Sequence, residues 1–125
     1  ASAKKVWAKM RIKPDLEETL AFARLLQNAG ASVVCVHGRT RQQKGNNPGK
    51  ADWDVIAKVK AELDIPVVAN GGVATFEDAQ RCLDATGADA VMAAVGLLEC
   101  PSLFANGTRV EPLAIAREYL EFADR

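Results

Sequence analysis

The hydrophobic positions along the chain follow two patterns in turn, short apolar stretches typical of strands and the 3.6-residue spacing of helices. Four short apolar stretches, of which residues 33–36 are the richest in β-branched residues, are typical of strands, and each precedes a segment whose apolar side chains recur at helical spacing. The predicted strands cover residues 6–12, 33–37, 65–69 and 89–94. The predicted helices begin near Asp15, Asp52, Thr75 and Pro112. The chain therefore repeats the order strand–helix four times.

Residues with capping and turn preferences mark the ends of these segments. Asp15 and Thr75 each stand three positions before an acidic residue, which is the pattern of a capping box. Gly30 is suited to end the first helix. A loop rich in Gly, Asn and Pro is expected over residues 42–50, a short turn or helix around 101–104, and a polar turn at 106–108.

Strands separated by helices run parallel and are joined by right-handed crossovers. Four such units form either a small doubly wound sheet or half of an eight-stranded barrel, because a whole barrel needs roughly 200 to 250 residues. In both architectures the loops that follow the strands share one rim. Residues 9–13, 37–41, 70–73 and 96–97 are expected to converge there.

The length and composition of residues 1–125 fit a single domain of ordinary globular character, with 49% hydrophobic and 26% charged residues. It starts without Met, which suggests a piece of a longer protein. We find no signal peptide and no apolar run near the roughly 20 residues that span a membrane. The three cysteines form no CxxC pair, which favours reduced thiols, no metal site and a cytoplasmic location, with a nuclear one also open.

Net charge is zero, so composition alone does not indicate nucleic-acid binding. The basic residues are nevertheless concentrated in two clusters, over residues 4–13 and 39–50. These clusters are either solvated loops or contacts for an anionic partner.

Two glycine turns follow the last two predicted strands, at Asn70-Gly71-Gly72 and Val95-Gly96-Leu97. Glycine allows close approach of the backbone to a ligand, and the N–H groups of such turns attract anions. Barrels of this type bind phosphate after their seventh and eighth strands. The alternative is that βα loops use glycine for turn geometry alone.

The chain's only histidine, His37, ends the second predicted strand beside Gly38 and Arg39. A neutral imidazole there could donate or accept a hydrogen bond, and a charged one could pair with a phosphate. Lys9 is expected among apolar strand residues, where a buried ammonium needs a partner such as a ligand anion. Alternatively, it pairs with a carboxylate or reaches the rim. Cys35 shares a strand face with His37 but lies deeper, as an unreactive cysteine does.

These motifs resemble those of the tRNA-dihydrouridine synthases. The resemblance covers residues 6–104 and is most specific where a His-Gly-Arg-Thr block is followed by Ala-Asp-Trp. The segments that carry it are Val6–Arg11, Val36–Arg41, Ala51–Trp53, Ile65–Gly71, Gly87–Met92 and Pro101–Phe104. It implies an α/β fold in which four consecutive βα units form the second half of a TIM (β/α)8 barrel.

The resemblance also implies an FMN-dependent oxidoreductase in which NADPH reduces FMN and a uracil in tRNA receives the hydride, while a cysteine supplies the proton. Lys9 and His37 would contact FMN and help to position the uracil. Asn70, Gly71 and Gly72 would hold the FMN phosphate on one side and Gly96 on the other. The residues expected at the rim near the phosphate or tRNA are Arg11, Arg39 and Arg41.

The chain departs from the family's pattern in two ways. Leu97 stands where the family usually has Arg, and one mostly eukaryotic branch of the family also lacks this Arg. Without it, phosphate binding would depend more on backbone N–H groups. The Gly-Cys-Pro context of the catalytic cysteine is absent, as are the first half of the barrel and the helical tRNA-binding domain. No catalytic residue is therefore expected in this chain. We expect the isolated chain to self-associate through open edges, to bind FMN weakly or not at all, and to be inactive.

Two other functions remain open from the residues. One is a different flavin- or phosphate-binding barrel, such as a dihydroorotate-dehydrogenase-like enzyme, which does not explain the His-Gly-Arg-Thr and Ala-Asp-Trp motifs. The other is a non-catalytic module that binds RNA or a nucleotide through the basic rim.

Overall fold

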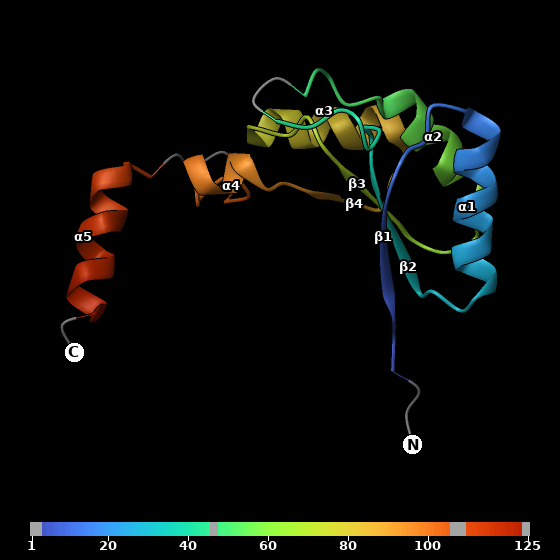
Figure 1. Ribbon diagram of the computed structural model, residues 1–125. Helices are drawn as coiled ribbons and strands as arrows, with labels where there is room; N and C mark the ends of the chain where they lie inside the picture. The colour runs from blue at the N-terminus through green and yellow to red at the C-terminus, as the bar shows by residue number, and fades with distance from the viewer. Residues whose placement is uncertain (1–3, 46–47, 106–109, 124–125) are drawn as a thin grey trace.

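The computed structural model describes residues 4–45, 48–105 and 110–123. Its strands form one parallel sheet in the order β1-β2-β3-β4, which confirms the predicted βα units (Figure 1). The strands are β1 (Trp7–Arg11), β2 (Val33–His37), β3 (Val67–Asn70) and β4 (Ala90–Met92). The helices are α1 (Leu16–Asn28), α2 (Trp53–Glu62), α3 (Phe76–Thr86), α4 (Val95–Glu99) and α5 (Pro112–Ala123).

The helix ends use the caps that the sequence predicts. The Asp15 side chain accepts a hydrogen bond from Glu18 N, and the Asp52 side chain accepts one from Val55 N. Thr75 and Asp78 form a complete, reciprocal capping box at the start of α3. Each cap satisfies backbone donors that have no partner inside the helix, so the starts of α1, α2 and α3 are fixed.

The two faces of the sheet differ. The helix-facing row Met10, Val36 and Ala69 is buried against α1, α2 and α3, which lie on the same side of the sheet (Figure 1). The opposite face carries Trp7, which is 63% exposed. In a closed barrel this second face is the interior, and here it is buried only at its centre, around residues such as Cys35 and Val68.

The structure corrects the prediction after the third helix. Strand β4 covers only Ala90–Met92 and is therefore shorter than the predicted 89–94. The Asp89 carboxylate, just before it, accepts hydrogen bonds from Lys60 Nζ and Val67 N, both at 2.8 Å. The residues from Pro101 form turns, which confirms the short turn or helix expected there, and a helix that was not expected, α4, precedes them at residues 95–99. The Ala94 carbonyl starts α4 by accepting from the N–H groups of residues 97 and 98. The polar turn predicted at 106–108 lies outside the described residues.

Helix α5 begins at Pro112 as predicted, but it lies apart from the sheet (Figure 1). None of its described residues is buried, and Leu113 and Leu120 are 69% and 60% exposed. The longest described helix, α1, has 13 residues, and within the described ranges none is long and apolar enough to cross a membrane.

Candidate functional site at the carboxyl rim of the sheet

The carboxyl ends of the strands bring the predicted site residues into one row. In the register of the sheet, Arg11 pairs with His37, His37 with Asn70, and Asn70 with Met92. Beside this row lies a groove of about 610 Å³. Among its lining residues are His37, Arg39, Asn70, Gly71, Gly72 and Gly96. The structure thus gathers every residue predicted to bind cofactor except Lys9.

The His-Gly-Arg and Ala-Asp-Trp motifs meet directly. Gly38 accepts a hydrogen bond from Asp52 N at 2.6 Å, and a Cβ at Gly38 would lie 2.7 Å from the Asp52 carbonyl oxygen. Trp53, the next residue, donates its indole N–H to Gly71 O at 2.9 Å. The two motifs therefore form one unit that joins the ends of β2 and β3, which explains why a resemblance carried by both is more specific than one carried by either.

The turn after β3 has a glycine-dependent conformation. Gly71 has φ +105° and Gly72 has φ +77°. A Cβ on Gly71 would lie 2.9 Å from His37 Cδ2, so a side chain there would displace the imidazole. Within the described part of the chain, the N–H groups of Gly71, Gly72 and Val73 have no hydrogen-bond acceptor. Successive free N–H groups in such a turn form a concave site for an anion.

Asn70 is buried and fastens β3 to β4. Its Nδ2 donates to Met92 O at 2.8 Å. No described hydrogen bond uses its Oδ1 atom. The side chain therefore supports the groove and also offers it an acceptor.

His37 lies in a strongly cationic environment. Burial, followed by the charges of Arg11, Lys9 and Arg39, lowers the pKa of His37 from 6.5 to about 4. Its Nε2 lies 3.3 Å from Arg39 Nη1, which favours a neutral ring that accepts from the guanidinium. His37 is therefore neutral at physiological pH and can take part in hydrogen bonds without a charge of its own.

The structure corrects the expectation that Lys9 is buried, because β1 is an edge strand and Lys9 is exposed on the open face. With Arg11 and Arg41, it lines a second groove of about 620 Å³ along this edge. Arg11 also has a structural role, since its Nη1 donates to Thr40 O at 2.8 Å and Gln43 O at 3.2 Å. The predicted rim thus divides, with Arg39 in the first groove and Arg11 and Arg41 in the second.

Gly96 lines the first groove from inside α4 rather than from a turn between strand and helix. A Cβ at this position would lie 2.8 Å from both Val73 O and Leu103 Cδ1. Close packing of α4 on the loop after β3 therefore accounts for glycine here, in addition to any contact with a ligand.

The cysteines do not form a reactive centre. All three are free, and burial raises the pKa of the Cys35 and Cys82 thiols. Cys35 Sγ lies 3.7 Å from Met92 Sδ, and Cys82 is fully buried in the core. Low-pKa thiolates are the nucleophilic form, so these two thiols are structural. Among the described residues, no group of His, Cys, Asp and Glu side chains is arranged to hold a metal ion.

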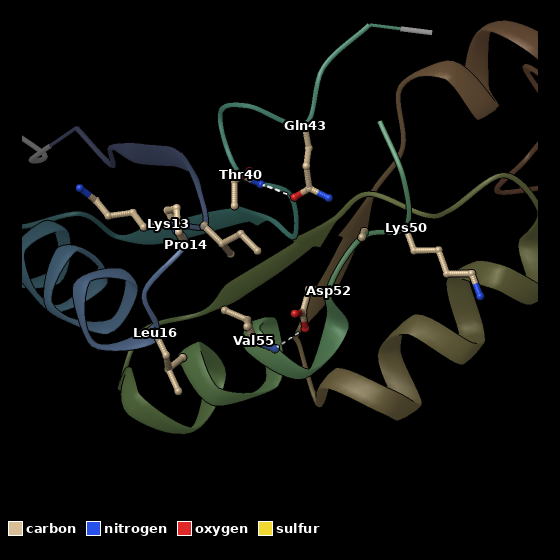
Figure 2. A pocket seen from close by; sticks show the side chains of 10 residues that line it. Lys13, Pro14, Leu16, Thr40, Gln43, Lys50, Asp52 and Val55 are labelled. Carbon is tan, nitrogen blue, oxygen red and sulfur yellow. Dashed lines mark hydrogen bonds between the residues drawn. The ribbon is translucent and has the colours of Figure 1, made fainter. Parts of the chain in front are cut away.

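A third hollow, of about 380 Å³, lies between the loops after β1 and β2 (Figure 2). Figure 2 shows Lys13 and Lys50 on opposite sides of it. Two of its lining side chains hold the loops in place, since Gln43 Oε1 accepts from Thr40 N at 2.8 Å and Asp52 caps α2.

Two contributors to the site were not singled out from the sequence as site residues. Trp53 was identified only as part of a motif, and Val73 only by its place after the glycines. The signal available for Trp53 was its position as the first residue of a helix beside the loop that follows β2. No local pattern specifies which carbonyl its indole contacts, because that contact joins residues 18 positions apart.

The parallel sheet, the helices on its outer face and the glycine turn at its carboxyl rim define a section of a βα barrel. The structural comparison agrees. A mandelate oxidase variant with a monooxide FMN adduct matches at TM-score 0.55 and 26% identity, over 70% of this chain and 29% of that one.

A family model described as dihydrouridine synthase matches residues 1–124, and the chain belongs to this family. It is 40% identical over 116 residues to a tRNA-dihydrouridine(16/17) synthase-like protein of Mus musculus, covering 93% of this chain and 24% of the relative. The Saccharomyces cerevisiae tRNA-dihydrouridine(16/17) synthase is 40% identical over 125 residues, covering 93% and 30%. A probable tRNA-dihydrouridine synthase 1 of Synechocystis is 45% identical over 113 residues, covering 80% and 31%. The chain thus spans about a quarter to a third of these relatives.

Proposed function

We propose that this chain is the second half of the FMN-binding barrel of an enzyme that reduces uridine to 5,6-dihydrouridine in tRNA, with NADPH as the reductant of FMN. One observation carries the proposal. In a chain of the dihydrouridine synthase family, a single groove joins His37 and Arg39 to the free N–H groups of the Asn70-Gly71-Gly72 turn.

The residues of the groove fit FMN. Its volume, about 610 Å³, is within the range of cofactor sites. The N–H groups of Gly71, Gly72 and Val73 would hold the phosphate, and Gly96 would form the opposite wall. FMN, when bound, supplies the hydride chemistry.

Lys9 and His37 would contact the flavin and position the uracil, whereas Asn70 would belong to the phosphate side of the groove. His37 is neutral, so it offers a directional hydrogen bond, while Lys9 offers a charge on the same open face. The proton donor would be a cysteine outside this chain, since none of Cys35, Cys82 and Cys100 is among the residues that line the groove.

The basic rim would contact tRNA. Arg39 and Arg41 follow β2, and neither forms an ion pair in the described part of the chain. Cations without a protein counter-ion are available to neutralise phosphates, and such binding weakens as salt is added. Arg11 would act mainly by fixing the loop that carries Arg41.

The test is a segment exchange. The matching segment of the Saccharomyces cerevisiae relative is replaced by this chain, and dihydrouridine is measured in tRNA from cells that lack their own copy of that relative. We expect the exchanged enzyme to restore dihydrouridine and to contain FMN, and the 125-residue chain alone to restore none. A matched exchange carrying His37→Ala should restore much less, whereas one carrying Lys58→Ala, on the exposed side of α2, should resemble the parent. A soluble, folded exchange enzyme that contains FMN but forms no dihydrouridine would contradict the proposal.

We also propose that the isolated chain self-associates. Its open sheet face, edge strands and the apolar side of α5 are uncovered, and such surfaces favour association. Light scattering at tens of micromolar should show dimers or larger species. A monodisperse monomer would show that these surfaces are tolerated in water.

A further inference from the structure

The loop after β3 contains one hydrogen bond that no binding role yet explains. Trp53 Nε1 donates to Gly71 O at 2.9 Å, and the indole is half-buried against the turn. A Cβ at Gly72 would lie 3.4 Å from Trp53 Nε1, so the ring lies directly beside both glycines. Among the described residues, this indole is the only side chain that forms a hydrogen bond to the Gly71-Gly72 pair.

This hydrogen bond determines the direction of a peptide unit. In a trans peptide the C=O and the following N–H point in opposite directions. Because Gly71 O points to Trp53, the N–H of Gly72 points away from Trp53. Gly71 and Gly72 both line the groove, and the Gly72 N–H has no acceptor in the described protein.

Among the described residues, no other hydrogen bond holds the carbonyl of Gly71 or the N–H of Gly72 against rotation of this peptide. Glycine adopts positive and negative φ with similar ease, so the Gly71-Gly72 peptide can turn over at little cost. The rotated peptide would direct a carbonyl oxygen where the N–H now lies, and a carbonyl oxygen repels an anion. A donor at a fixed place is therefore needed to keep the N–H orientation.

Trp53 provides such a fixed donor because its own position is set by β2. It is the first residue of α2, directly after Asp52, whose N–H donates to Gly38 O at 2.6 Å and whose side chain caps the helix. The Gly38 N–H in turn donates to Asn70 O at 3.0 Å. The end of β2 and the start of α2 thus hold the turn after β3 from two sides.

We propose that Trp53 is a positioning residue for the phosphate site, in which its indole N–H holds the Gly71 carbonyl away from the groove so that the Gly72 N–H faces the bound phosphate group. This inference rests on the proposed function, which places a phosphate at this turn. Trp53 itself makes no contact with the phosphate.

The test uses the 125-residue chain, inorganic phosphate as the probe and backbone amide NMR shifts as the readout, at constant ionic strength. The amides of Gly71, Gly72 and Val73 should shift to saturation in the parent. In the Trp7→Phe variant, Trp53 is the only tryptophan. Biosynthetic incorporation of the benzothienyl analogue of tryptophan then replaces Trp53 with a ring of the same size that has no N–H to donate to Gly71 O. Loss of one such hydrogen bond should weaken phosphate binding about five- to tenfold. Trp53→Phe should have the same effect, and Trp7→Phe alone should have none.

The outcomes separate the two proposals. If the parent amides shift and the analogue binds phosphate equally well, Trp53 is not a positioning residue and the phosphate site stands. If the parent amides do not respond to phosphate, the isolated chain has no phosphate site and the role proposed for Trp53 fails, whereas the segment exchange decides the proposed function separately. Thermal melting of each variant accompanies the titration, and weakened binding at an unchanged melting temperature separates positioning from loss of fold.

Discussion

The middle of the chain and its C-terminal end use the same sequence pattern with different results. Helices α2 and α5 both carry apolar residues at helical spacing. In α2, Ile56 and Val59 are fully buried between the sheet and its neighbours. In α5, no described residue is buried. Spacing therefore specifies a helix and its apolar face, but a helix acquires a fixed position only where the chain supplies a surface to cover that face.

The two faces of the sheet show the same difference. The outer face is complete, because α1, α2 and α3 cover it. The inner face is polar at the rim and partly open, because the strands that would close a barrel are not in this chain. The groove lined by His37 and Asn70 lies at the boundary between the two faces, supported from the complete side by Trp53 and open on the other side.

The largest expected effect tests the contrast between the buried helix α2 and the exposed helix α5. Ile56→Ala empties a fully buried site beneath Gly38, and it should lower the free energy of unfolding by about 2–5 kcal/mol. Leu120→Ala, at a position 60% exposed, should change it by less than about 0.5 kcal/mol. Urea unfolding followed by circular dichroism measures both. A Leu120→Ala cost close to that of Ile56→Ala would show that α5 is packed in solution, through self-association, and would remove the contrast.

An intermediate effect is expected at the glycine turn. Gly71 and Gly30 have similar φ values, +105° and +96°, but an added Cβ meets His37 and Ala51 at Gly71 and nothing within 4 Å at Gly30. Gly30→Ala should cost about 1 kcal/mol from backbone strain alone. Gly71→Ala should cost about 1–2 kcal/mol more and should shift the His37 ring signals in NMR spectra. Equal costs would mean that the imidazole moves aside freely, and that the turn and His37 are not packed as a unit.

Much of the fold could be predicted because its determinants are local. Asp52 and Thr75 start their helices with their own side chains, and the β-branched runs of β2 and β3 form buried strands. Such signals do not depend on distant residues, so the order of elements was predicted through α3. The bounds of β1 and β3 differ from the predicted ones by one or two residues. The larger errors lie after α3, where β4 ends at Met92 and a short helix that the pattern does not predict there, α4, follows at Val95–Glu99.

The site was predictable in part for a related reason. His37 and Asn70 lie at strand ends, and strand ends of a parallel sheet share one rim, so their convergence follows from topology. The exposure of Lys9 does not, because it depends on which strand lies beside β1. The link between Trp53 and Gly71 is a tertiary contact that spacing cannot specify. The fold therefore follows from periodicity, whereas the support of the site follows from contacts between units.

The smallest expected effect concerns the charge on the open face. The chain has one histidine, so its ring signals report directly on His37. Burial and the charges of Arg11, Lys9 and Arg39 lower its pKa to about 4. Of these cations Lys9 is the suitable one to remove, since Arg11 also holds the loop at Thr40. In Lys9→Gln the pKa of His37 should rise, yet remain below 6.5 because burial and two cations persist. Lys58→Gln, in α2, should leave it unchanged.

The lowered pKa of His37 also determines how the stability of the fold depends on pH. The unfolded chain binds a proton at His37 below about pH 6.5, whereas the folded chain binds it only below about pH 4. Unfolding therefore takes up a proton between these values, and the contribution of His37 to stability is present in full above pH 6.5 and is lost as the pH falls towards 4. His37→Gln should flatten the fall in stability over this interval, as measured by thermal melting at each pH. An undiminished slope would assign the acid sensitivity to carboxylates such as Asp78 and Asp89, whose lowered pKa values act at more acidic pH.

Since added phosphate supplies the counter-charge that this face lacks, it should raise the pKa of His37 in the parent and do so less in Lys9→Gln.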